Sequence, residues 1–294
     1  MGLRAVVGAL LWCATSVLPS WGADLVRVKD DSASADNALQ IELKAFVTSD
    51  YVYRGVSLSA RKPSVGSTID VEWNGFYSNT NFQSVKLPTN PAVEITLNGG
   101  YRWDMWDFSF DLGASYFYYP GEIIPEGGVK TSYWEYELNV SRKVASFGEL
   151  EGTVAYAPDL SNTGAWGAYA EVEATIDLTR YKLLNDTRWR LIAGAGYWRF
   201  GTTSPAQGGF RLPSHANWRV GLQFDLNDYL TLDVAYSDTS LSQENCFVFT
   251  GDPAATPGGA VNAISNPDGL RSHLCGAAVV GTLTATFEPL KAKR

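Results

Sequence analysis

Apolar and polar residues alternate along most of the chain beyond residue 39, and this two-residue period predicts β-strands. The clearest run covers residues 106–119, where aromatic and aliphatic residues alternate with Asp, Ser and Gly. Residues 166–177 and 230–237 repeat the pattern. Successive side chains of a strand point to opposite faces, so each run has one apolar and one polar face. No long segment has a helical period that competes with this.

About twelve such runs follow one another, at residues 41–53, 65–73, 76–85, 93–103, 106–119, 133–141, 147–157, 166–177, 189–199, 218–225, 229–238 and 277–287. The connections between them alternate in length. Tight turns are expected at residues 74–75, 104–105, 144–146 and 227–228, and residues 178–188 form a somewhat longer one. The other connections are long, at residues 54–64, 86–92, 120–130, 158–165, 200–216 and 239–276. Short turns at one end and long loops at the other predict an all-β fold, a transmembrane antiparallel up-and-down β-barrel.

The alternative to a barrel is a soluble β-sandwich, which has the same period but buries its apolar face. The position of the aromatic residues favours the barrel, because membrane interfaces select aromatic belts on either side of an aliphatic band. One belt is expected beside the short turns, at Trp73, Phe76, Trp103, Trp106, Trp189, Trp218 and Tyr229. The other is expected towards the long loops, at Tyr53, Tyr119, Tyr156, Trp166 and Tyr236.

The N-terminus has the pattern of a targeting segment. Arg4 precedes an apolar core at residues 5–17 and a small-residue exit near Ala23, as in a cleaved secretory signal peptide over residues 1–23. Residues 24–38 are polar and aperiodic, which predicts a flexible periplasmic arm. The barrel then occupies residues 39–294, with residues 239–276 as a long external loop. We therefore expect export to the outer membrane of a Gram-negative bacterium.

The composition excludes several classes of function. The net charge is −8, and it becomes −9 when Arg4 is removed with the signal peptide, which argues against a nucleic-acid partner. With only 2 histidines, both expected in loops, no metal site, cofactor or histidine-based catalysis is predicted. Paired carboxylates such as Glu135 and Glu137 have the spacing that acid–base catalysis uses. On a barrel strand the polarity of the lumen explains that spacing equally well, so no enzymatic activity is expected.

The polar face of the strands is acidic, and this predicts the character of the pore. The candidate pore-lining residues are Asp70, Glu72, Glu94, Asp107, Asp111, Glu135, Glu137, Glu149, Glu151, Glu171, Glu173 and Asp233, with Arg190 and Arg219 among the few opposing bases. An open lumen with this surplus would favour cations, because a low-dielectric wall focuses the field. The alternative is a closed barrel filled by ion pairs and water, since twelve strands lie between small filled barrels and wide porins.

The first predicted strand ends in a motif, Ser49-Asp50-Tyr51-Val52-Tyr53-Arg54-Gly55, with Lys62-Pro63 following it. This segment, continued more loosely through Asp70 and Gly75-Phe76-Tyr77, resembles the opening signature of the TorF family of bacterial outer-membrane porins. The resemblance implies passive passage of solutes and carries no binding residues with it. From the residues themselves, we expect Arg54 to pair with Asp50 at the barrel mouth and Gly55 to permit a bend into the first loop.

Cys246 and Cys275 are the two cysteines outside the signal peptide, and both lie in the long loop at residues 239–276. An even count in an oxidising compartment predicts a disulfide. The expected function is a cation-preferring porin for small solutes. The alternative is a non-conducting barrel with an adhesive or structural role through its loops. The expected partners are outer-membrane lipid and lipopolysaccharide, the barrel-assembly machinery and further copies of the chain in a homo-oligomer. Many bacterial barrels end at the terminal aromatic that the assembly machinery recognises, whereas seven residues follow Phe287 here.

Overall fold

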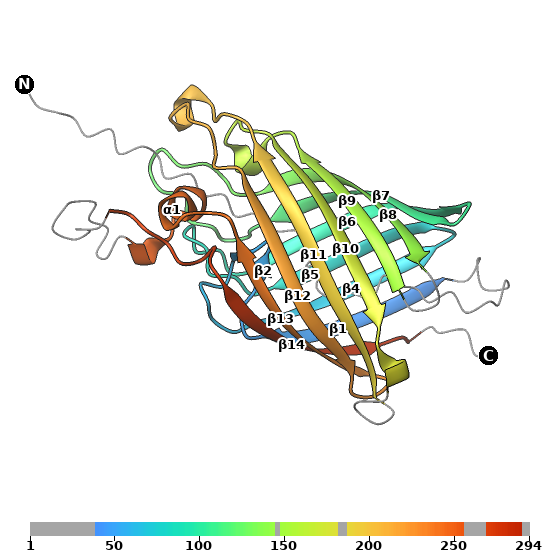
Figure 1. The fold of residues 1–294 in the computed structure, drawn as a ribbon. Coiled ribbons are helices and arrows are strands. Elements are labelled where there is room, and N and C mark those ends of the chain that lie inside the picture. Colours follow the sequence, from blue (N-terminus) through green and yellow to red (C-terminus); the bar gives the residue numbers. More distant parts are fainter. Residues whose placement is uncertain (1–38, 145–147, 182–186, 256–268, 290–294) are drawn as a thin grey trace, which may run out of the picture.

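The chain folds as a closed antiparallel barrel of twelve strands (Figure 1). The computed structural model describes residues 39–144, 148–181, 187–255 and 269–289. The signal peptide and arm predicted for residues 1–38 lie outside these ranges. The wall consists of β1 (Gln40–Thr48), β4 (Ser64–Trp73), β5 (Phe76–Gln83), β6 (Glu94–Met105), β7 (Phe108–Tyr118), β8 (Tyr133–Val144), β9 (Gly148–Ala157), β10 (Gly167–Asp177), β11 (Arg188–Phe200), β12 (His215–Asp225), β13 (Leu230–Thr239) and β14 (Ala278–Phe287).

Each strand pairs with its neighbours in sequence order, and the seam between β1 and β14 closes the sheet. The register of the seam runs from Leu43 opposite Phe287 to Thr48 opposite Thr282. Closure leaves no free sheet edge, which is the condition for a sheet to span hydrocarbon. The prediction of an up-and-down barrel is confirmed. None of the helices in the described ranges has the length and apolar character needed to cross a membrane.

The two ends of the barrel differ as the sequence predicts. At the short-turn end, Asn74 and Gly75 both have positive φ, at 52° and 80°, as a two-residue hairpin turn requires. The long-loop end carries a small hairpin of β2 (Val52–Tyr53) and β3 (Val56–Ser57) in its first loop and α1 (Gln243–Thr250) in its last (Figure 1). Short 3-10 turns occur at Leu160–Asn162, Thr179–Tyr181, Pro205–Gln207 and Pro253–Ala255.

The outer surface of the wall is apolar, the reverse of a soluble sandwich. Exposed aliphatic side chains cover its middle, including Leu43, Val65, Ile69, Leu97, Leu112, Leu150, Val154, Val172, Val220 and Val234. Exposed aromatic side chains gather near the short turns, at Trp73, Phe76, Tyr101, Trp106 and Tyr229, and near the long loops, at Tyr118, Trp134, Tyr136, Tyr156 and Tyr197. This arrangement fits a bilayer with two interfaces.

Four of the aromatic positions differ from the expectation. Trp189, expected in the belt beside the short turns, is buried at 9% exposed. Trp218 lies near the start of β12, at the long-loop end. Tyr53 and Tyr119 are 3% and 1% exposed, so they face the interior and do not belong to a belt. Strand boundaries differ as well, because β1 ends at Thr48 and the motif that follows it leaves the wall. His215, expected in a loop, is the first residue of β12.

Candidate functional site: the barrel lumen

The motif after β1 folds back into the long-loop end of the lumen. Residues 50–58, here called the plug segment, are all buried. Strands β2 and β3 pair through Val52–Ser57 and Tyr53–Val56, so Arg54 and Gly55 form a two-residue turn, with φ of 42° and 83°. Positive φ at both positions is the signature of a tight hairpin, and it is costly for any residue except glycine, Asn or Asp. A Cβ at Gly55 would overlap the side chain of Thr239 on β13, so the turn lies directly against the far wall. The expected bend at Gly55 is confirmed.

Arg54 anchors the plug segment to the wall through two kinds of contact. Its guanidinium donates two hydrogen bonds of 3.0 Å to the carboxylate of Glu135 on β8. It also lies over the rings of Tyr169 and Trp198, with 3.8 Å and 4.5 Å to the ring centroids. Burial alone would lower the pKa of Arg54, and the charge of Glu135 outweighs it, so the pKa is raised above its ordinary value. Arg54 is therefore a fixed cation in a largely apolar site.

The expected ion pair between Arg54 and Asp50 is wrong, because the hairpin carries Arg54 away from β1. Asp50 instead accepts hydrogen bonds from the hydroxyls of Ser57 at 2.6 Å and Ser59 at 2.9 Å. Arg61 approaches its other oxygen at 3.4 Å. Asp50 thus holds the base of the plug segment, and Arg54 holds its tip.

A second buried carboxylate secures the base of the plug segment. Glu94, at the start of β6, accepts hydrogen bonds from the hydroxyls of Tyr51 at 2.9 Å and Tyr119 at 3.0 Å. Burial, with the charge of Glu94 as a smaller cause, raises the pKa of the Tyr51 hydroxyl well above its usual value. Both glutamates, predicted as pore lining, therefore lie on the lumen side and face the plug segment rather than open water.

Apolar side chains from most of the wall surround the plug segment. The cluster comprises Tyr51, Tyr53, Val56, Leu58, Val85, Leu87, Phe117, Tyr119, Tyr133, Ala155, Ala157, Leu160, Ala165, Tyr169, Trp198, Phe200, Leu212, Cys246, Phe249 and Cys275. Several of these, such as Tyr169 and Trp198, occupy lumen-facing positions of their strands. The buried core of this protein is thus inside the barrel and at one end of it.

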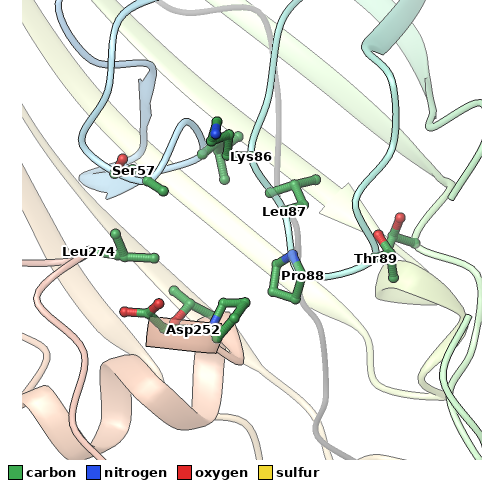
Figure 2. A pocket seen from close by; sticks show the side chains of 12 residues that line it. Ser57, Lys86, Leu87, Pro88, Thr89, Asp252 and Leu274 are labelled. Atoms are coloured by element: carbon green, nitrogen blue, oxygen red, sulfur yellow. The ribbon is translucent and has the colours of Figure 1, made fainter. Parts of the chain in front are cut away.

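The last loop covers the plug segment from outside. Cys246 of α1 is bonded to Cys275, so the predicted disulfide is confirmed. The ring of Phe249 lies 5.2 Å from that of Phe200, and the amide of Ser57 donates to the carbonyl of Leu274 at 2.8 Å. Between these loops remains a cavity of about 20 Å³, lined by side chains such as Lys86, Pro88 and Thr89, together with Ser57 and Leu274 (Figure 2). That volume holds about one water molecule.

Below the plug segment, the wall formed by β8, β9 and β10 is strongly acidic. Glu137, Glu149, Glu151, Glu171 and Glu173 all lie at lumen-facing positions of these strands. Glu151 and Glu173 are direct cross-strand partners, which places like charges opposite each other. On β12, Arg219 is the basic residue that contacts these carboxylates. Its Nε donates a hydrogen bond to Glu173 at 2.9 Å.

The wall formed by β4–β7 is also polar, and an arginine links two of its carboxylates. Arg102 bridges Glu72 at 2.7 Å and Asp111 at 3.0 Å, and its guanidinium lies 3.9 Å from the centroid of the Tyr77 ring. Asn79 donates to Asp70 at 3.2 Å. On β11–β13, Arg190 pairs with Asp225 at 2.8 Å, and Gln223 donates to Asp233 at 3.3 Å. Carboxylates therefore outnumber bases on both walls, with the larger group on β8–β10.

Asp107 is the predicted pore-lining residue that the structure places elsewhere. The turn between β6 and β7 falls at residues 106–107 instead of 104–105, so Asp107 lies outside the strands. Its side chain is 80% exposed and lies 3.4 Å from Arg142. In the described part of the chain, no three His, Cys, Asp or Glu side chains are grouped as metal ligands.

The sequence reasoning missed the plug, and one signal pointed to it. Tyr169 is in phase with Glu171 and Glu173, and Trp198 is in phase with Arg190. Bulky aromatic rings at lumen-facing positions, all near the long loops, indicate that the interior of the barrel is filled at that end. The confirmed bend at Gly55 is also the tip of a hairpin, and a two-residue turn ending in Gly between alternating residues is a sequence signal for one.

Comparison with models of protein families assigns the chain to one family. Residues 32–258 match the model described as "Bacterial protein of unknown function (Gcw_chp)". The chain belongs to the Gcw_chp family. A search of curated proteins found no match.

Among solved structures, the Gcw_chp barrel is similar to other barrels at low identity. The KdgM porin in complex with disordered oligogalacturonate is 8% identical, with 84% of this chain and 98% of that chain covered and a TM-score of 0.43. An outer membrane channel from Pseudomonas putida F1 is 10% identical, with 86% and 96% covered and a TM-score of 0.42. LpxR from Salmonella typhimurium is 10% identical, with 84% and 99% covered and a TM-score of 0.38.

Proposed function

We propose that this Gcw_chp protein is an outer-membrane channel for small solutes, that it prefers cations, and that the plug segment closes its external mouth. The observation that carries the proposal is the surplus of carboxylates on β8–β10, where Arg219 contacts Glu173 and Arg54 lies 3.9 Å from Glu137. The resemblance of the opening motif to the TorF porins points in the same direction. No catalytic role forms part of the proposal.

The placement in the outer membrane rests on the surface of the barrel. An apolar band bounded by exposed aromatic side chains covers its outside. In bacterial barrels the short turns face the periplasm and the long loops face the exterior. By that rule the plug segment and the disulfide loop lie on the external side, and the acidic wall opens towards the periplasm.

The charge argument rests on the surplus of carboxylates in the lumen. A filled barrel that only needs to be stable would match its buried charges, but the single base Arg102 bridges both Glu72 and Asp111. Glu151 faces Glu173 directly, a pairing that opposes folding. Carboxylates kept in this arrangement produce a negative potential inside a low-dielectric wall, and such a potential concentrates cations.

The experiment is planar-bilayer recording of the refolded mature protein in a potassium chloride gradient. Three proteins are compared: the wild type, a variant lacking residues 51–58, and that deletion combined with E151Q/E171Q/E173Q. The deletion leaves seven loop residues between β1 and β4, enough for a hairpin. The charge-matched control adds E126Q/D228N/E244Q to the deletion, which removes three exposed carboxylates outside the lumen.

The expected result is small or rare conductance from the wild type and large steps with a cationic reversal potential from the deletion variant. The three lumen substitutions should then reduce the cation preference, and the three external ones should leave it unchanged. An anionic reversal potential from the deletion variant would contradict the charge argument. Equal effects of the lumen and external substitutions would contradict it as well.

The second candidate is a non-conducting barrel with an adhesive or structural role. It is favoured by the apolar cluster around the plug segment, because such a core stabilises a closed state. A deletion variant that is folded, as judged by circular dichroism and heat-dependent gel mobility, and yet never conducts would reject the channel in favour of this candidate.

A further inference from the structure

A groove lies on the outside of the barrel at the long-loop end, separate from the lumen. Its volume is about 580 Å³, and it is lined by Tyr197, Arg199, Arg211, Leu212, Pro213, Ser214, Asn245 and Val248. The first two residues belong to β11, the last two to α1, and the others to the connection between β11 and β12. The disulfide in the last loop joins α1 to residues next to β14, so this side of the groove is held in place.

Two arginines give the groove its charge. Arg199 is exposed on the outer face of β11, between the buried Trp198 and Phe200. Among outward-facing positions in the long-loop halves of the described strands, Arg199 is the only basic one. Arg211 is positioned beside β11 by a bridge to Thr202, and its Nε donates to the carbonyl of Phe200 at 3.3 Å. Within the described ranges neither guanidinium has a carboxylate partner, and no acidic side chain lines the groove.

The position of the groove along the barrel axis indicates which part of the membrane it contacts. Tyr197 belongs to the aromatic belt near the long loops, and Arg199 is two residues further along the same face. Since a strand rises about 3.3 Å per residue, Arg199 lies ~7 Å beyond the belt, at the level of lipid phosphates. Below it the outer face is smooth, because Tyr197 pairs with Ala170 on one side and Ala216 on the other. Acyl chains can pack closely along such a surface.

We propose that this groove binds a phosphorylated glycolipid of the external leaflet, the lipid A part of lipopolysaccharide. Arg199 and Arg211 contact a phosphate, because guanidinium groups bind phosphate through paired hydrogen bonds. The ring of Tyr197 lies beneath the sugar, and Val248 contacts its apolar edge. This inference rests on the outer-membrane placement given under the proposed function, and it does not require the barrel to conduct.

The test measures binding of purified diphosphorylated lipid A to the refolded, disulfide-bonded mature protein in detergent by native mass spectrometry. The groove variant is R199Q/R211Q, and the charge-matched control is K62Q/K130Q, which removes two exposed cations from other external loops. The groove variant should bind about tenfold or more weakly, because it lacks both cations that contact the phosphate. Chemically dephosphorylated lipid A should bind the wild type about as weakly as lipid A binds the variant.

Equal weakening in K62Q/K130Q would overturn the proposal, since it would mean that general surface charge attracts the lipid. Unchanged affinity in R199Q/R211Q would also overturn it, as would equal binding of dephosphorylated lipid A. Folding of every variant is checked by heat-dependent gel mobility, and R199K/R211K should recover part of the affinity. Conductance of the deletion variant described above is recorded in bilayers free of lipopolysaccharide, so failure of the channel and failure of the groove give different results.

Discussion

Removing the charge of Arg54 is the sharpest test of how the plug segment is held. In the variant R54Q, the carboxylate of Glu135 loses both hydrogen bonds and its counter-ion, although it is only 1% exposed. The rings of Tyr169 and Trp198 lose a cation at the same time. The barrel wall keeps all of its strand pairing, because Arg54 lies in a loop turn. The expected effect is therefore local release of the plug segment from an otherwise intact barrel.

The size of the effect follows from the burial of the pair. Removing one partner of a buried ion pair destabilises a structure by about 3–5 kcal/mol, since the other charge is left unpaired away from water. The left-handed backbone at residue 54 costs the same with Arg or Gln, so it cancels from the comparison. A loss of about 3–5 kcal/mol corresponds to a rise of roughly 150- to 4,000-fold in the population of the released state, at about 1.4 kcal/mol per factor of ten.

Hydrogen–deuterium exchange with mass spectrometry measures that population directly. The amide of Leu58 donates to the carbonyl of Tyr51 at 2.7 Å, so a peptide covering residues 50–58 reports plug opening. Exchange there should accelerate by the factor above in R54Q, while peptides from β6–β8 keep their rates. The control is K62Q, which removes an exposed cation of the same loop. Equal acceleration in K62Q, or none in R54Q, would refute the assignment of Arg54 as the anchor.

Three further results are expected. Gly55→Ala should also release the plug segment, because a Cβ there meets Thr239 and the φ of 83° disfavours any side chain. The peptide covering residues 50–58 should then exchange faster, and unchanged exchange would argue against close contact with β13. C246S/C275S should lose about 3–4 kcal/mol of loop stabilisation by the loop-closure relation. The loss should appear as faster protease cleavage of the last loop. Two free thiols in the unfolded, unreduced wild type would disprove the disulfide bond. R219Q in the plug-deletion background should increase cation preference, because Glu173 loses its base; a reversal potential that does not move would show that this wall does not set selectivity.

The barrel could be predicted from sequence because the membrane imposes a simple pattern on every strand. Outward positions such as Leu97 and Leu112 must be apolar, and inward ones such as Asn98 and Asp111 can be polar, so a period of two persists for the whole wall. The alternation of short turns and long loops then indicates which strand ends lie at the same end of the barrel. The error at Asp107 arose from a shift of two residues in one turn, since Trp106 continues the aromatic phase of β7 although it lies in the turn itself.

The plug segment could not be predicted in the same way, because its partners are distant in sequence. Glu135 lies 81 residues from Arg54, and at sequence level it resembles every other carboxylate on the polar face. Asp50 was the nearest acid on the same predicted face, and extending β1 to residue 53 made that pair geometrically reasonable. The structure ends β1 at Thr48, which turns the motif inward and changes every partner of Arg54.

Closure of the seam between β1 and β14 completes the surroundings of the plug segment. The plug segment follows β1 immediately, yet the wall that receives it comes from β8 and β10–β13, which enter the sheet much later in the chain. Its outer cover, the carbonyl of Leu274, precedes β14 and reaches Ser57 only when β14 is in place beside β1. The full set of contacts around the plug segment therefore exists only in the closed cylinder, with β1 and β14 paired in register.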